Sequence, residues 1–121
     1  FITKYIYVPM PPEINQEGFN ALTEVGIKND KREALWRLAF NYNHKKINFS
    51  RIEDYFIEKR DSYYLIELIS AVYEDLDVDE IIQKVIFTRE NIFINEVAKQ
   101  GHKVGIIDEE NIKELENWNN S

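Results

Sequence analysis

The acidic run YEDLDVDE, at residues 73–80, is the part of the chain where residue types and spacing best suggest chemistry. Asp75, Asp77 and Asp79 reproduce the spacing of the first three ligands of a calcium-binding loop. Such a loop also needs glycine at its sixth position and a bidentate glutamate at its twelfth, and here those positions hold glutamate and isoleucine. The sequence therefore excludes this type of calcium site, and Asp77 is predicted to cap the helix that follows.

The rest of the chain lacks the residues that a metal site or a catalytic nucleophile would need. Zinc takes three or four protein ligands, but the chain has no cysteine and only two histidines, His44 and His102, far apart in sequence. We expect both histidines in exposed turns. No serine lies in a strand-turn-helix elbow, and the glycines are scattered rather than gathered in a phosphate-binding loop. The sequence predicts no metal, no cofactor and no enzymatic activity.

Pairs of adjacent carboxylates are the remaining candidates for acid–base chemistry, and they include those at 53–54, 74–75 and 109–110. General acid–base catalysis needs a carboxylate with a perturbed pKa in a cleft, and adjacency in sequence supplies neither. Consecutive acids are favoured at a helix start, because the exposed N–H groups there carry partial positive charge. We therefore interpret the pairs as structural.

Size and composition limit the class of protein. With 121 residues and 44% hydrophobic content, the chain is expected to form one domain over 1–121. No apolar run approaches the roughly 20 residues that cross a bilayer, and the first residues do not resemble a signal peptide. We expect a cytoplasmic protein. The net charge of −7 argues against a dedicated duplex-DNA binder.

A hydrophobic pattern that recurs about every thirty residues predicts the secondary-structure elements on which a functional site would lie. The pattern Leu35, Trp36, Leu38, Ala39 returns as Leu65, Ile66, Leu68, Ile69, and a second match relates Ile47, Phe49, Ile52, Phe56, Ile57 to Leu76, Val78, Ile81, Val85, Ile86. Within each copy, apolar residues lie three and four positions apart, which is helical spacing. The predicted helices cover 16–26, 31–43, 50–60, 62–74, 78–87, 89–100 and 109–118.

Capping signals support these boundaries. Asp30, Ser50 and Asp77 each precede an acid by three residues, as in a capping box, Asp108 is a further N-cap, and Gly101 suits the end of a helix. The fold class is therefore all-α: short α-hairpin repeats over 16–118, stacked as a small solenoid or an irregular bundle of about seven helices. Residues 1–12, which contain three prolines, are expected to be extended or irregular.

Short paired helices at this period resemble HEAT-like α-hairpin repeats over residues 31–118. The resemblance implies a non-catalytic scaffold that binds other proteins on a helix-lined surface. Among the aromatic residues, the register places six in the core: Trp36, Phe40, Phe49, Phe56, Phe87 and Phe93. Four tyrosines beside charged residues are expected at the surface, where tyrosine favours recognition: Tyr42, Tyr55, Tyr63 and Tyr73.

Charge is distributed unevenly along the chain. Residues 28–60 hold nine basic and five acidic side chains, whereas residues 61–121 hold five basic and fourteen acidic. If the hairpins stack, the turns after successive first helices lie on one edge, which brings 74–80 near 103–110. The predicted partner-binding residues on this edge are Tyr73, Glu74, Asp75, Asp77, Asp79, Asp108, Glu109 and Glu110.

These observations favour a protein-binding module over an enzyme. The leading hypothesis is an acidic inhibitor or immunity-type protein that docks and neutralises a basic protein such as a nuclease toxin, with carboxylates placed where phosphates would lie. One alternative is a structural or assembly adaptor that binds through an apolar surface. The other is a nucleic-acid-associated module that uses the basic region 28–60, although acids within 51–60 would repel phosphates. We expect the protein neither to bind a membrane nor to hold a cofactor.

Overall fold

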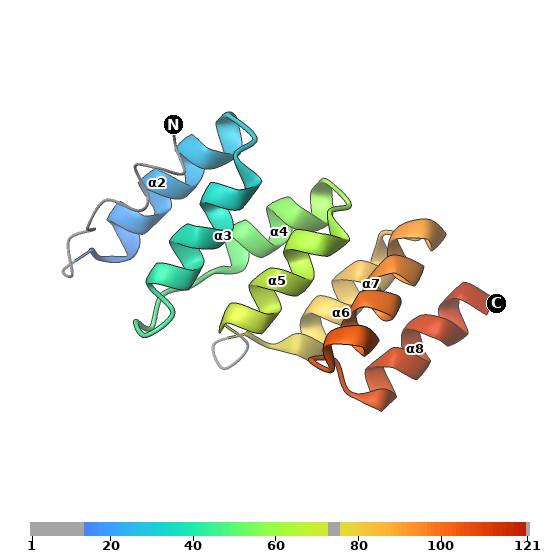
Figure 1. The fold of residues 1–121 in the computed structure, drawn as a ribbon. Helices are drawn as coiled ribbons and strands as arrows, with labels where there is room; N and C mark the ends of the chain where they lie inside the picture. The colour runs from blue at the N-terminus through green and yellow to red at the C-terminus, as the bar shows by residue number, and fades with distance from the viewer. Residues whose placement is uncertain (1–13, 73–75, 121) are drawn as a thin grey trace.

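The computed structural model describes residues 14–72 and 76–120 of the chain, and in these residues it contains seven α-helices and no strand (Figure 1). The predicted all-α class is therefore confirmed. Residues 1–12, expected to be extended, lie outside the described residues. The helices are α2 Gln16–Lys28, α3 Arg32–Asn41, α4 Ser50–Glu58, α5 Ser62–Val72, α6 Val78–Phe87, α7 Asn91–Val104 and α8 Glu109–Asn120.

Three tight turns divide most of the chain into hairpins, α2–α3, α4–α5 and α6–α7. Each turn has one residue with positive φ: Asp30 at 50°, Arg60 at 56° and Arg89 at 57°. In the first two turns the next N–H donates back to a carbonyl five residues earlier, Lys31 to Gly26 and Asp61 to Phe56, both at 2.9 Å. The hydrophobic period of about thirty residues thus coincides with a repeat of the backbone.

The hairpins stack into two layers. Helices α3, α5 and α7 contact one another in succession, and α2, α4, α6 and α8 form the second layer (Figure 1). The core lies between the layers and includes Leu35, Leu65 and Ile94, which occupy the same place relative to the three turns and are all buried.

Polar side chains tie each repeat to the next. The indole N–H of Trp36 on α3 donates to the carbonyl of Glu67 on α5 at 3.0 Å. The Gln100 amide on α7 donates to the Ser62 hydroxyl on α5 at 3.1 Å. On the other layer, the amide of Gln83 donates to the carboxylate of Glu114, which joins α6 to α8. Neighbouring helices are therefore held in register by directional bonds as well as by apolar packing.

Several predicted boundaries need correction. Helix α7 continues to Val104, so His102 lies in its last turn instead of a loop, while His44 does lie in a turn. Gly101 is buried within α7, and Gly105, at φ +76°, follows the helix. Asp30 is a turn residue and not a cap.

The predicted Ser50 cap is also wrong, because Ser50 is the first residue of α4 and Phe49 precedes it without a side-chain capping bond. The predicted caps Asp77 and Asp108 are confirmed: each carboxylate accepts a hydrogen bond from the backbone N–H three residues later.

The predicted burial of four aromatic residues is wrong. Phe40 is half exposed and Phe87 is 81% exposed, although the register placed both in the core. Tyr42 and Tyr55, predicted at the surface, are buried. Tyr42 packs edge-on against Phe19, with ring centroids 6.3 Å apart. The hydroxyl of Tyr55 donates to the Asp30 carboxylate, and burial together with this bond raises the pKa of Tyr55 to about 12.

Gly101 gives a first testable prediction. A Cβ at this position would lie 2.8 Å from Cγ1 and 3.2 Å from Cβ of Ile107, a buried residue of the α7–α8 loop. Overpacking costs about 1–3 kcal/mol, and the helix-propensity gain of about 1 kcal/mol opposes it. We expect Gly101→Ala to lower the free energy of unfolding by about 1 kcal/mol, measured by urea denaturation. Gly18→Ala, beside the half-buried Ile14, is the control, and an equal or higher stability for Gly101→Ala would contradict the close packing.

Candidate functional site

The carboxylates predicted to bind a partner lie at the first turns of α6 and α8. Asp77 precedes α6 and accepts from the N–H of Glu80 at 3.1 Å. Asp108 precedes α8 and accepts from the N–H of Asn111 at 2.9 Å. The two helix starts thus use the same capping bond, and each presents further acidic residues in its first turn.

One hydrogen bond brings the two helix starts together. The amide Nδ2 of Asn111, whose side chain is buried, donates to Oδ1 of Asp79 at 2.8 Å. Residues 32 positions apart in sequence are therefore neighbours at one edge of the stack. This juxtaposition is the one predicted from the repeat for residues 74–80 and 103–110.

Five of the predicted residues form a surface, termed here the acidic edge: Asp77, Asp79, Asp108, Glu109 and Glu110. All five are exposed. Among the described residues, none of them lies within 4.0 Å of a basic nitrogen, whereas the neighbouring Glu80 pairs with Lys84 at 3.6 Å. Tyr73, Glu74 and Asp75, the other predicted binding residues, lie outside the described residues.

The acidic edge has a structural role as well. Each helix start carries a partial positive charge on its free N–H groups, which stabilises carboxylates in the first turn. Lys103 and Lys113 also lie nearby, in the last turn of α7 and the second turn of α8. The surface therefore combines helix capping with an excess of exposed negative charge.

The basic residues of 28–60 are divided between the two ends of the hairpins, with Lys59 and Arg60 at the α4–α5 turn, next to the α2–α3 turn. Lys28 and Lys31 lie at the α2–α3 turn, whereas Lys45 and Lys46 lie in the α3–α4 loop, at opposite ends of α3. Three arginines are held by nearby carboxylates: Arg32 by Asp30 and Asp61, Arg37 by Glu33, and Arg51 by Glu24. This dispersal disfavours the nucleic-acid alternative, because phosphate tracking needs clustered free cations.

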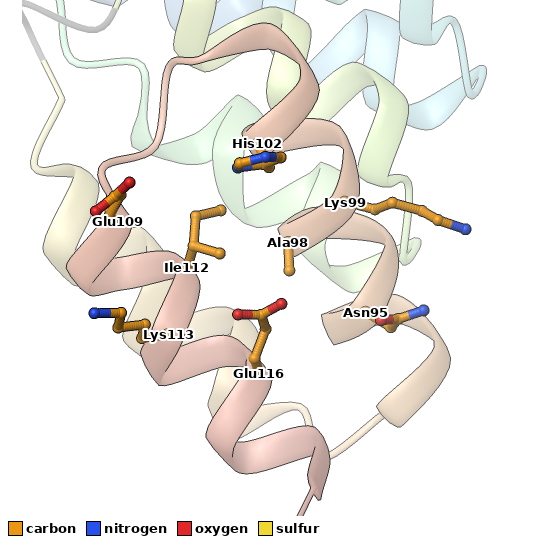
Figure 2. Close-up of a pocket in the computed structure, with 8 residues that line it drawn as sticks. All are labelled: Asn95, Ala98, Lys99, His102, Glu109, Ile112, Lys113 and Glu116. Atoms are coloured by element: carbon orange, nitrogen blue, oxygen red, sulfur yellow. The ribbon is translucent and has the colours of Figure 1, made fainter.

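A cleft between α7 and α8 lies at the last exposed face of the stack. Figure 2 shows Ala98 and Ile112 facing each other across it, with His102 and Glu116 beside them. Relative to the positive-φ turn residue, Asn95 and Ala98 take the places of Ile66 and Ile69, which are buried on α5. At these two positions α7 therefore carries a polar and a small side chain where α5 carries two large apolar ones.

A second groove separates α4 from α6, and sequence reasoning missed it. Its lining includes Ile57, Phe87 and three carboxylates, and its volume is about 880 Å³. A smaller groove of about 280 Å³ lies between α2 and the start of α4. A signal for the larger groove exists in the sequence. Two residues before the positive-φ position, the three hairpins carry Lys28, Glu58 and Phe87, so an aromatic residue stands where the other repeats are charged.

Lys84 controls the electrostatics of this groove. Its ammonium lies 2.9 Å from the Glu53 carboxylate, 3.0 Å from Asp54 and 3.6 Å from Glu80. Burial disfavours the charged ammonium, but the bonds to Glu53 and Asp54 outweigh this and raise the pKa of Lys84. Burial also raises the pKa of Glu53, whose side chain is 5% exposed, and the bond to Lys84 offsets that only in part.

Two further features concern metal binding and membrane insertion. In residues 14–72 and 76–120, no three histidine or acidic side chains come together in a way that could hold a metal ion. Over the same part of the chain, no helix has the length and apolar content needed to cross a membrane.

The chain was also compared with known proteins. No family model, no curated protein and no solved structure matches it.

Proposed function

We propose that the protein is a non-enzymatic, all-helical binding module that docks a basic protein through the acidic edge, as an inhibitor or immunity-type protein would. The carboxylates supply long-range attraction and orient the partner during encounter. A basic enzyme whose own ligand is a phosphate chain fits this chemistry, because carboxylates at helix starts can take the place of phosphates.

The observation that supports this proposal is the bond between Asp79 and Asn111. It fixes the starts of α6 and α8 side by side, so exposed carboxylates from two helices form one surface instead of two separate caps. The basic residues are spread over both ends of the hairpins and are partly neutralised. The charge asymmetry therefore favours attraction of a cationic partner.

Reversing charge on the acidic edge tests the proposal. A basic partner is first captured from lysate at low salt, eluted at high salt and identified. We expect the double variant Glu109→Lys/Glu110→Lys to slow association with that partner about tenfold at low ionic strength, and to reduce the salt dependence of the rate. Surface plasmon resonance at several salt concentrations measures both effects.

Glu17→Lys is the matched control, since Glu17 is an exposed acid in the first turn of α2, away from the acidic edge. It carries the same helix-dipole cost of about 0.3–1 kcal/mol per residue without touching the proposed surface. Equal association rates for the wild type and the double variant would refute docking through the acidic edge.

A second candidate function is an assembly adaptor that binds through apolar contacts. The exposure of Phe87, at 81%, and of Ile92, at 84%, favours it. Salt separates the two candidates, because an apolar interface survives high ionic strength whereas docking through carboxylates weakens.

A further inference from the structure

Phe87 is an exposed aromatic residue that the helical stack does not explain. It is the last residue of α6, and its counterparts at the ends of α2 and α4 are Lys28 and Glu58. Those two hairpins also turn through a residue with positive φ, and they do so with a charged side chain at this position. The fold therefore does not require an apolar residue there, and contact with another molecule would account for it.

Phe87 borders the groove between α4 and α6 and gives it an apolar end. Ile57 on α4 lies in the same lining, where it is 8% exposed, so the exposed ring of Phe87 and the largely buried Ile57 together form the apolar, turn end of the groove. Ile92, which is just as exposed, belongs to α7 and is not part of the lining. The groove thus has a place for one apolar side chain of a ligand.

The rest of the groove is acidic. Asp54, Glu58 and Glu80, termed the acidic rim, line it together with Arg60 and Lys84. The Arg60 guanidinium donates to the backbone carbonyls of Ile57 and Glu58, at 2.7 and 3.3 Å, and Lys84 is held by carboxylates. Counting the buried Glu53 beneath Lys84, four carboxylates face two cations that already have partners.

The groove also adjoins the acidic edge. Glu80 lies in the first turn of α6, directly after Asp77 and Asp79, and at the same time lines the groove. A ligand that approaches the acidic edge can therefore continue along α6, from Glu80 at one end to Phe87 at the other.

We propose that the groove between α4 and α6 binds a basic amphipathic segment of the partner protein. An apolar side chain of that segment packs against Ile57 and Phe87, and its lysine or arginine side chains lie beside the acidic rim. This inference rests on the proposed function in that both require a basic partner, but it assigns a different surface and a different anchor.

A defined probe tests the groove without knowledge of the natural partner. The probe is a short fluorescein-labelled helical peptide of leucine and lysine, and a matched peptide carries glutamate in place of lysine. We expect the lysine peptide to bind, with amide chemical-shift changes on α4 and α6 and with weaker binding at high salt. Phe87→Ala should weaken binding about tenfold or more, as loss of an anchoring aromatic does. The matched control Ile92→Ala should leave binding unchanged, and both variants should stay folded because both side chains are exposed.

Four results would refute binding of a basic segment in the groove. Two concern affinity: the glutamate peptide binds as tightly as the lysine peptide, or Phe87→Ala and Ile92→Ala weaken binding equally. The other two are chemical-shift changes confined to the starts of α6 and α8, and a concentration-dependent self-association of the protein that Phe87→Ala abolishes. The third result leaves the acidic edge in place as the docking surface, and the fourth assigns the groove to a second copy of the chain. Conversely, if Phe87→Ala weakens binding of the natural partner while Glu109→Lys/Glu110→Lys does not, the result supports the groove as the binding site and refutes docking through the acidic edge.

Discussion

Replacing Lys84 with methionine should lower the free energy of unfolding at neutral pH by about 3 kcal/mol. The reason is that Glu53, with a side chain only 5% exposed, would keep its charge in a buried place without its cation. Breaking a buried pair costs about 3–5 kcal/mol, and the lower end applies because Lys84 itself is a third exposed. Urea denaturation at pH 7 measures the loss.

The pH dependence of this variant provides an independent check. Burial already raises the pKa of Glu53 above its ordinary value of 4.5, and removal of Lys84 raises it further. An acid with a raised folded-state pKa binds more protons in the folded chain than in the unfolded one, so stability falls as the pH rises from 4.5 towards the folded value. We expect the deficit of Lys84→Met to be smaller at pH 4 than at pH 7.

Two further variants complete the test. Lys84→Met/Glu53→Leu should recover most of the lost stability, because it removes the stranded carboxylate along with its partner. Lys113→Met, at an exposed lysine of α8, should change stability by less than about 0.5 kcal/mol. A Lys84→Met protein as stable as the wild type at pH 7 would refute the dependence of Glu53 on this pair.

Truncation of the core gives the other large expected effect. Leu68 is fully buried in the middle of α5, which packs against α3, α4 and α7. Leu68→Ala removes apolar contacts and leaves a cavity between layers that cannot fully collapse, so we expect a loss of roughly 2–5 kcal/mol. Thermal and urea unfolding both report this loss.

Ser70→Ala is the matched control on the same helix. Ser70 is exposed, and its hydroxyl donates to the backbone carbonyl of Ile66 at 2.9 Å. We expect a change of less than about 0.5 kcal/mol. Similar effects for the two variants would mean that Leu68 does not lie in the core and that the predicted register is wrong.

The sequence was sufficient to predict the helices and much of their placement. Apolar residues three and four apart mark the buried faces, and Asp77 and Asp108 mark the starts of α6 and α8 because a side-chain oxygen must satisfy a free N–H there. The recurrence of the pattern then predicted that these two starts are neighbours, which the bond from Asn111 to Asp79 confirms.

The errors have a common physical origin in tertiary contacts. Gly101 resembles a helix end, but it is glycine because Ile107 packs against it. Asp30 resembles a cap, but Arg32 and Tyr55 bind its carboxylate in the turn. Phe87 continues the apolar register, yet among the described residues no helix covers the end of α6 at that point, so it is exposed. Tyr55 is 25 positions from Asp30, and a contact at that separation is not visible in the local pattern. The groove between α4 and α6 could not be predicted for the same reason.

The bonds between successive repeats also determine how the molecule comes apart. Trp36 with Glu67, Lys84 with Glu53 and Gln83 with Glu114 each join residues about thirty positions apart. Among the described helices, α2 and α8 have packed neighbours on one side only, so either can detach while the helices behind it keep their bonds. We therefore expect unfolding to spread inward from these two helices, with α5, which has packed helices on both sides, losing its structure last.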